Sequence, residues 1–172
     1  MRRFSCPPPA PTGPDTNDVL AAARRYAASA QPVGPGARLA VVACMDNRFD
    51  VTRLLGLEAS DAYVIRNAGG ILTEDVRRSL AIAQNALGVE EVVLIHHTDC
   101  GMSRLDDAQF ASALAERTGL RPMWRPGGFT CAEQDLREML TALARDPHIP
   151  AGATARGFVH DVTGGSLPEA PA

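Results

Sequence analysis

Two stretches of sequence, LAVVACMDNR at residues 39–48 and VVLIHHTDCG at residues 92–101, decide the fold of this chain. Each begins with a run of apolar residues that includes β-branched side chains, which is typical of a strand buried on both faces. Each then continues into polar and metal-binding side chains. Because open α/β sheets bind their ligands at the carboxyl ends of the strands, the two stretches predict a functional site where two neighbouring parallel strands end.

The rest of the chain alternates between strand and helix patterns. Further strands are expected at residues 62–65 and 157–162, where β-branched and aromatic residues gather. An alanine-rich helix is expected over residues 19–29, and another follows Thr73, whose hydroxyl can cap it, and stops before Gly88. Strands separated by helices predict right-handed crossovers. We therefore expect an α/β fold with a mainly parallel central sheet, flanked by helices on both faces.

The carboxyl-terminal third contains one further helix pattern. Residues 102–129 hold several prolines and glycines around Trp124, so a short helix and a loop are expected there. Thr130, followed three residues later by Glu133, matches a capping box, which predicts that a helix begins at this point. Pro147 is expected to end that helix.

Length and composition predict one globular domain. The chain has 172 residues, of which 45% are hydrophobic, and this suffices for one core. Five prolines lie within residues 5–14, and little else there can be buried. We expect residues 1–14 to form a disordered arm and residues 15–172 to form a single domain, which would carry the site.

Charge and hydropathy argue against two classes of partner. The net charge of −3 offers no basic surface for nucleic acid. No apolar run approaches the ~20 residues of a membrane helix, and the start Met1-Arg2-Arg3 leads into prolines instead of an apolar export signal. We expect a cytoplasmic protein that binds neither nucleic acid nor membranes.

The two thiols and the imidazole of the quoted stretches suit a metal. Cysteines of a cytosolic protein are more often metal-binding or catalytic than disulfide-bonded. A catalytic zinc ion takes three protein ligands from such groups and keeps a fourth position open, and Cys44, His97 and Cys100 match that number. His96 would face the other side of the strand. The sequence predicts one Zn²⁺ per chain, although Cys44 and Cys100 could instead form a metal-free redox pair.

Two charged residues follow the first candidate ligand. Asp46 and Arg48 lie two residues apart, so an extended backbone would direct both side chains the same way. Beside a metal, the carboxylate can accept a hydrogen bond from the activated water while the guanidinium fixes the carboxylate. Asp46 could also fill the fourth metal position if Arg48 released it. For Asp99, a hydrogen bond to the loop backbone and a plain turn role are equally open.

A loop of small residues follows the strand at 62–65. Its residues Asn67, Ala68, Gly69 and Gly70 would let the backbone approach the metal closely. Taken alone, the glycine pair indicates only a turn. Together with the predicted ligands, it is a candidate loop for holding substrate.

These blocks, in this order, resemble the β-class carbonic anhydrases, whose pattern is Cys-x-Asp-x-Arg, then Arg-Asn-Ala-Gly, then His-x-x-Cys-Gly. The similarity covers residues 40–101, and residues 158–165 resemble the closing strand of that family's compact bacterial branch. The resemblance implies that Cys44, His97 and Cys100 bind zinc and that Asp46 and Arg48 act as the catalytic pair. It also implies the conversion of carbon dioxide and water to bicarbonate and a proton.

The same resemblance implies an obligate homodimer, possibly paired into a tetramer, in which residues 15–30 pack on the neighbouring subunit. Two departures limit it: Asn47 replaces a small residue, and no glutamine directly precedes the first strand. A few relatives of this fold hydrolyse carbon disulfide or carbonyl sulfide with the same ligands, so that activity remains an alternative. A non-catalytic zinc-binding dimer closed by Asp46 is another.

Overall fold

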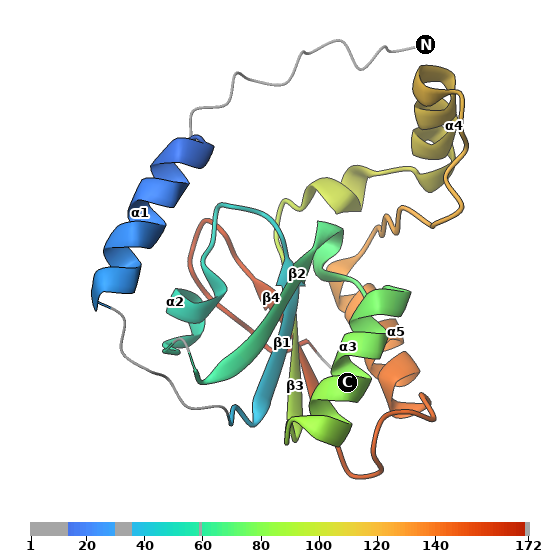
Figure 1. Cartoon of the computed structure of the whole chain (residues 1–172). Helices are drawn as coiled ribbons and strands as arrows, with labels where there is room; N and C mark the ends of the chain where they lie inside the picture. The colour runs from blue at the N-terminus through green and yellow to red at the C-terminus, as the bar shows by residue number, and fades with distance from the viewer. Residues whose placement is uncertain (1–13, 30–35, 59, 171–172) are drawn as a thin grey trace. The chain divides into compact units, whose positions relative to one another are not determined.

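A computed structural model describes residues 14–29, 36–58 and 60–170 of the chain (Figure 1). They fall into two compact units, Met1–Val33 and Gly34–Ala172. The described part of the first unit is helix α1, Thr16–Ser29, which begins three residues before the expected start. The predicted disordered arm lies outside the described residues, except for its last residue.

The second unit is built on a four-stranded sheet in the order β2-β1-β3-β4, with every pairing parallel. The prediction of a parallel central sheet is therefore confirmed. The strands run over Leu39–Cys44 (β1), Ala62–Asn67 (β2), Glu91–His97 (β3) and Thr154–His160 (β4).

The last strand differs from its expected position. It begins three residues early because Thr154 already pairs with Glu91 of β3. It ends at His160 because Asp161 starts a turn, in which its carbonyl accepts from the Gly165 N–H at 2.8 Å and its carboxylate from the Thr163 N–H at 2.9 Å. The expected range of 157–162 was wrong at both ends.

Helices cover both faces of the sheet, as predicted, with α3 and α5 together on one side and α2 on the other (Figure 1). The Thr73 hydroxyl accepts a hydrogen bond from the Val76 N–H at 3.3 Å, so the expected cap of α3 is confirmed. The region at 102–129 holds a short helix and a loop, as expected. The helices of this unit are α2 (Val51–Leu55), α3 (Glu74–Ala86), α4 (Asp107–Thr118) and α5 (Ala132–Ala144), with 3₁₀ turns η1 (Ala68–Gly70) and η2 (Gly101–Arg104).

The predicted capping box at Thr130 and Glu133 is wrong. The residue that caps α5 is Cys131, which makes no side-chain capping hydrogen bond, and the Glu133 carboxylate instead faces the Cys131 thiol at 3.3 Å. The preceding Phe129 is buried, and its N–H donates to the Met102 carbonyl. This packing holds the chain extended for one residue longer than the local pattern predicts.

The core lies in two layers, one on each face of the sheet. Alternation along β1 sends Val42 toward α3 and α5, where Leu80 and Leu136 are fully buried, and sends Val41 to the opposite layer. The second layer also contains Cys44 and Cys100 and is partly covered by α2. The candidate metal ligands therefore belong to a packed layer of the core rather than to a surface loop.

The turn after β2 passes very close to the first strand. Gly70 has a φ of +69°, and a Cβ placed there would lie 2.7 Å from the Cys44 nitrogen and 2.8 Å from the Ala43 carbonyl carbon. Only glycine combines this backbone conformation with this approach. The small residues of the loop are therefore required by the contact with the end of β1.

Replacing the core leucine Leu136 by alanine should destabilise the protein by about 2–5 kcal/mol, because it leaves a cavity between α5 and β4. Leu120→Ala is the matched control, since that side chain is 75% exposed, and it should change the free energy of unfolding by less than about 0.5 kcal/mol. Urea unfolding followed by circular dichroism measures both. Equal losses would contradict the assigned core.

Gly70→Ala should destabilise the protein more than Gly88→Ala. Both glycines have positive φ, so each substitution costs about 1–2 kcal/mol of backbone strain, but a Cβ on Gly88 meets nothing within 4 Å. Only the change at Gly70 must also displace the backbone at Cys44. Urea unfolding and metal content of the two variants test this, and indistinguishable behaviour would rule out the close approach.

Candidate metal centre

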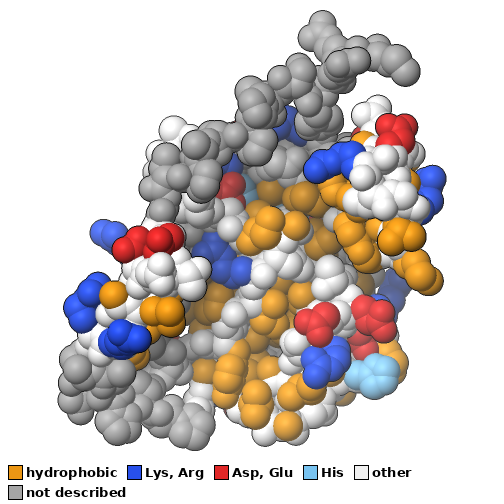
Figure 2. Space-filling view, turned by 45° about the horizontal axis from the view of Figure 1, so that its top comes forward, with side chains coloured by type: hydrophobic (Ala, Val, Ile, Leu, Met, Phe, Trp, Pro, Cys, Tyr) orange, Lys and Arg blue, Asp and Glu red, His pale blue; other side chains and the backbone are white. Residues whose placement is uncertain are grey.

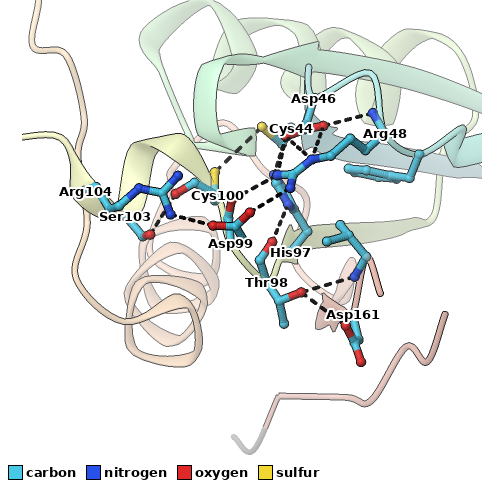
Figure 3. Close-up of polar contacts among 12 residues, drawn as sticks. Cys44, Asp46, Arg48, His97, Thr98, Asp99, Cys100, Ser103, Arg104 and Asp161 are labelled. Atoms are coloured by element: carbon cyan, nitrogen blue, oxygen red, sulfur yellow. Dashed lines mark hydrogen bonds and ion pairs between the residues drawn. The ribbon is translucent and has the colours of Figure 1, made fainter. Parts of the chain in front are cut away.

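Three potential ligand atoms meet where β1 and β3 end. The sulfur atoms of Cys44 and Cys100 and a ring nitrogen of His97 all lie within 4.8 Å of one another, and all three residues are buried (Figure 3). The two sulfur atoms are 3.9 Å apart. The structure thus brings together the three residues that the sequence predicted as ligands.

Pairing of the two central strands produces this cluster. Ala43 of β1 lies opposite Ile95 of β3, so Cys44 and His97 leave the sheet at the same edge. Cys100 returns to that edge because Asp99 adopts a positive φ of 52°. The turn is held by Ser103, whose N–H and hydroxyl donate to the Cys100 carbonyl at 3.1 and 2.7 Å.

The ring of His97 is oriented as a ligand. Its Nδ1 lies 2.9 Å from the Thr98 carbonyl and must donate to it, which leaves Nε2 unprotonated in the neutral ring. Nε2 is buried and has no hydrogen-bond partner among the described residues. A backbone acceptor on one ring nitrogen and an open lone pair on the other are typical of metal-bound histidine.

The pKa shifts of the two thiols also favour binding of a cation. A hydrogen bond from Cys100, assisted by backbone N–H groups of Asp46 and Gly69, lowers the pKa of Cys44 to about 4. The neighbouring Cys44 sulfur and burial raise the pKa of Cys100. A second thiolate is therefore unfavourable until a positive ion balances both. Two sulfurs and one imidazole nitrogen are a donor set that suits a metal ion such as zinc.

Asp46 and Arg48 form the predicted ion pair directly beside the cluster. The Arg48 Nη2 and Nε atoms donate to the Asp46 Oδ2 at 2.7 and 3.1 Å, and Nε also contacts Oδ1 at 3.0 Å. These bonds to Arg48 lower the pKa of Asp46 to about 2. The same Oδ2 lies 3.8 Å from the His97 Nε2. The carboxylate therefore stands between the guanidinium and the potential ligand atoms.

Sequence reasoning missed the contacts of Asp99. Its carboxylate accepts from two guanidinium groups, Arg48 at 2.8 Å and Arg104 at 2.5 Å, rather than from the loop backbone. The expected turn role is borne out by its positive φ. An aspartate between two predicted metal ligands, with an arginine five residues later, is the only signal that the sequence offered.

Arg66 is a second residue whose role was missed. From the edge strand β2 it reaches across the end of β1, where its Nε donates to the Cys44 carbonyl at 2.9 Å and its Nη2 to the Phe49 carbonyl at 3.3 Å. Its guanidinium also stacks over the Phe49 ring, 5.3 Å from the centroid. The strand register, which pairs Arg66 with Ala43, creates these contacts and was not available from the sequence.

The loop after β2 lies against the cluster, as expected from its small residues. The Asn67 amide closes the turn through two 2.9 Å hydrogen bonds with the backbone of Ile71. Ala68 follows, and Gly69 and Gly70 are buried. The backbone N–H of Gly69 contributes to the lowered pKa of Cys44.

The other histidines and cysteines of the described chain lie outside the cluster. His96 faces the opposite side of β3, where it contacts Asp135 at 2.7 Å and stacks on Phe129. The side chains of Cys131 and His148 are exposed. His160 is buried and packs against Phe49. None of these four residues is part of the three-residue group, and for His96 this agrees with the side expected from strand alternation.

Comparisons with known proteins agree with this geometry. A family model described as carbonic anhydrase matches residues 39–124. The chain is 45% identical to "Beta-carbonic anhydrase 1" of Mycobacterium tuberculosis over 157 residues, which is 90% of this chain and 96% of the relative. It is 35% identical over 155 residues to a carbon disulfide hydrolase of Acidithiobacillus thiooxidans, covering 76% of this chain and 75% of that protein.

A solved structure shows the same fold. The crystal structure of carbonic anhydrase from Streptococcus mutans superposes with a TM-score of 0.82 at 34% identity, covering 90% of this chain and 96% of that one. The family model, the relative that matches nearly end to end and the shared arrangement of strands lead to one conclusion: this chain belongs to the β-carbonic anhydrase family.

Proposed function

We propose that this protein catalyses the reversible hydration of carbon dioxide to bicarbonate and a proton, with one zinc ion per chain. The observation that carries the proposal is the buried group Cys44, His97 and Cys100 with the Asp46 carboxylate 3.8 Å from the free His97 nitrogen. Membership of the β-carbonic anhydrases supports it.

Cys44, His97 and Cys100 are proposed as the zinc ligands. A zinc ion held there would lower the pKa of a water molecule and so make that water a stronger nucleophile. Two thiolates give the site more negative charge than three imidazoles would, so we expect that water to ionise at higher pH than in a three-histidine site, where its pKa is about 7. Activity should therefore favour alkaline conditions.

Asp46 and Arg48 are proposed as the catalytic pair. With its pKa held near 2 by Arg48, the Asp46 carboxylate stays ionised at every working pH. Its Oδ2 can then accept a hydrogen bond from the attacking water and direct the lone pair of that water toward the carbon atom of the substrate. Arg48 holds the carboxylate in this position and keeps it from binding the metal.

The loop Asn67-Ala68-Gly69-Gly70 is proposed to border the substrate. Its backbone contacts Cys44, and a Cβ on Gly69 would lie 3.2 Å from Met102, so the loop leaves little room for side chains. A small apolar molecule such as carbon dioxide suits a site edged by backbone and thioether groups.

Carbon disulfide or carbonyl sulfide is the alternative substrate, favoured by the carbon disulfide hydrolase relative. A non-catalytic zinc protein would require Asp46 to bind the metal, and its pairing with Arg48 counts against this. A redox pair leaves the unprotonated His97 nitrogen without a purpose.

The protein is further proposed to be a homodimer, possibly a tetramer, in the cytoplasm. Hydrophobic side chains are exposed on the visible face in Figure 2. Val64 of the edge strand β2, Ile82 of α3 and Leu87 at the end of α3 are 36–46% exposed. Val19 and Leu20 of α1 are more than half exposed. Such surfaces are typical of subunit contacts. No helix among the described residues is long and apolar enough to span a membrane.

The first test is stopped-flow hydration of carbon dioxide by the purified protein at mildly acidic and alkaline pH, with zinc measured on the same sample. We expect one zinc per chain and a rate that rises with pH. Removal of zinc by a chelator should abolish turnover, and added zinc should restore it. Zinc without turnover would favour the sulfur substrates or the non-catalytic protein, and a metal-free protein would favour the redox pair.

Arg48→Ala should leave zinc bound but lower kcat/KM by about 100-fold or more, at the upper end of the effects of removing a residue that orients a metal site. The matched control is Arg53→Ala, which removes an exposed arginine of α2 and should leave the rate unchanged. Zinc analysis and stopped-flow kinetics measure both. Full activity of the Arg48 variant would refute the role of the pair.

A further inference from the structure

Asp99 lies between two arginines at the rim of the candidate metal centre (Figure 3). Its Oδ2 accepts from the Arg48 Nη1 at 2.8 Å, and its Oδ1 accepts from the Arg104 Nη1 at 2.5 Å. Its backbone carbonyl accepts from the Arg48 Nη2 at 2.9 Å. Among the described residues, it is the only non-glycine residue with a positive φ. Such strain persists where the surrounding structure needs the conformation.

The guanidinium of Arg48 is thereby held on two sides. One edge binds Asp46, and the other binds the carboxylate and the carbonyl of Asp99. Because the Arg48 side chain is 41% exposed, a bond to Asp46 alone would let the two side chains move together. Asp99 ties Arg48 to the end of β3, so Arg48 becomes a fixed anchor for Asp46.

Arg104 supports Asp99 from the solvent side. It belongs to η2, immediately after Cys100, and it binds the Asp99 oxygen that Arg48 leaves free. The four side chains form a line of alternating charge, Asp46, Arg48, Asp99 and Arg104, from the potential ligands to the surface (Figure 3). The outer pair is more than half exposed, so Arg104 should contribute less than Asp99.

We propose that Asp99 is a positioning residue which, supported by Arg104, keeps Arg48 on Asp46 and so prevents Asp46 from becoming the fourth metal ligand. The inference rests on the proposed function insofar as an open fourth position serves catalysis. Loss of Asp99 should let Arg48 leave. The Asp46 Oδ2 already lies 3.8 Å from the His97 Nε2, so the freed carboxylate would be close enough to bind the same metal ion.

The test uses Asp99→Asn in the full chain, loaded with zinc for kinetics and with cobalt(II) for spectroscopy. Asparagine tolerates the positive φ and keeps the backbone carbonyl. The substitution removes the negative charge and replaces one of the two acceptor oxygens by an NH2 donor, so at least one guanidinium loses its partner. Azide is the probe of an open position: it should change the visible absorption of the cobalt wild-type protein. The variant should lose most of this azide response, and its rate of carbon dioxide hydration should fall at least about tenfold. Its metal content should be unchanged.

Three further variants make the result specific. Arg104→Ala should weaken the azide response in the same direction and reduce turnover by about two- to fivefold, as for an exposed ion pair. Asp161→Asn removes a nearby carboxylate that contacts Thr98, and Arg125→Ala removes an exposed guanidinium paired with Asp107. Both controls should behave as wild type.

The double variant Asp46→Asn with Asp99→Asn identifies the closing group. Because it lacks the carboxylate that would bind the metal, it should regain the azide response while remaining inactive. A wild-type azide response and turnover of Asp99→Asn would overturn the inference, as would a double variant that stays unresponsive. If Asp99→Asn fails to fold, a wild-type result for Arg104→Ala overturns it.

Failure of the proposed function gives a different pattern. In that case the wild-type zinc protein does not hydrate carbon dioxide, yet the azide responses of the cobalt variants still differ as described. That outcome supports the positioning role of Asp99 and excludes only carbon dioxide as the substrate.

Discussion

The parallel pairing of β1 with β3 is the constraint on which the rest of the structure depends. It brings the ends of the strands that carry Cys44 and His97 to one edge of the sheet, 53 residues apart in the chain but on neighbouring strands. The turn through Asp99 then adds Cys100. Because both strands are largely buried on both faces, the packed core fixes where Cys44 and His97 stand, and only Cys100 depends on a turn.

The surroundings of the three potential ligands are organised by charges rather than by apolar contacts. A buried imidazole nitrogen without a hydrogen-bond partner is unfavourable, and so is a second thiolate beside the first. The described residues around the cluster supply backbone N–H groups to Cys44 and place a carboxylate near His97. The carboxylate is in turn balanced by a guanidinium, and that guanidinium by another carboxylate. The charges of Asp46, Arg48 and Asp99 each have an oppositely charged neighbour, so this group of side chains can lie at the edge of an apolar core.

The sequence predicted the sheet, the three potential ligands and the Asp46–Arg48 pair because each has a local signature: buried strand patterns, a ligand spacing of three residues and two charges on one side of an extended segment. It failed where distant parts of the chain decide the outcome. The start of α5 depends on the packing of Phe129, and the start of β4 depends on pairing with Glu91. The contacts of Arg66 and Asp99 depend on strand register and on a turn conformation, and neither follows from neighbouring residues.

Arg66 connects the edge of the sheet by a hydrogen bond to Cys44, one of the potential metal ligands. Arg66 belongs to β2, which is an edge strand of the sheet. Its guanidinium donates hydrogen bonds to the carbonyl groups of Cys44, at the end of the neighbouring strand β1, and of Phe49 beyond it. A side chain of the outermost strand therefore helps to set the position of the backbone that carries the Cys44 thiol, so a change at the edge of the sheet can alter the cluster without touching any of its three members.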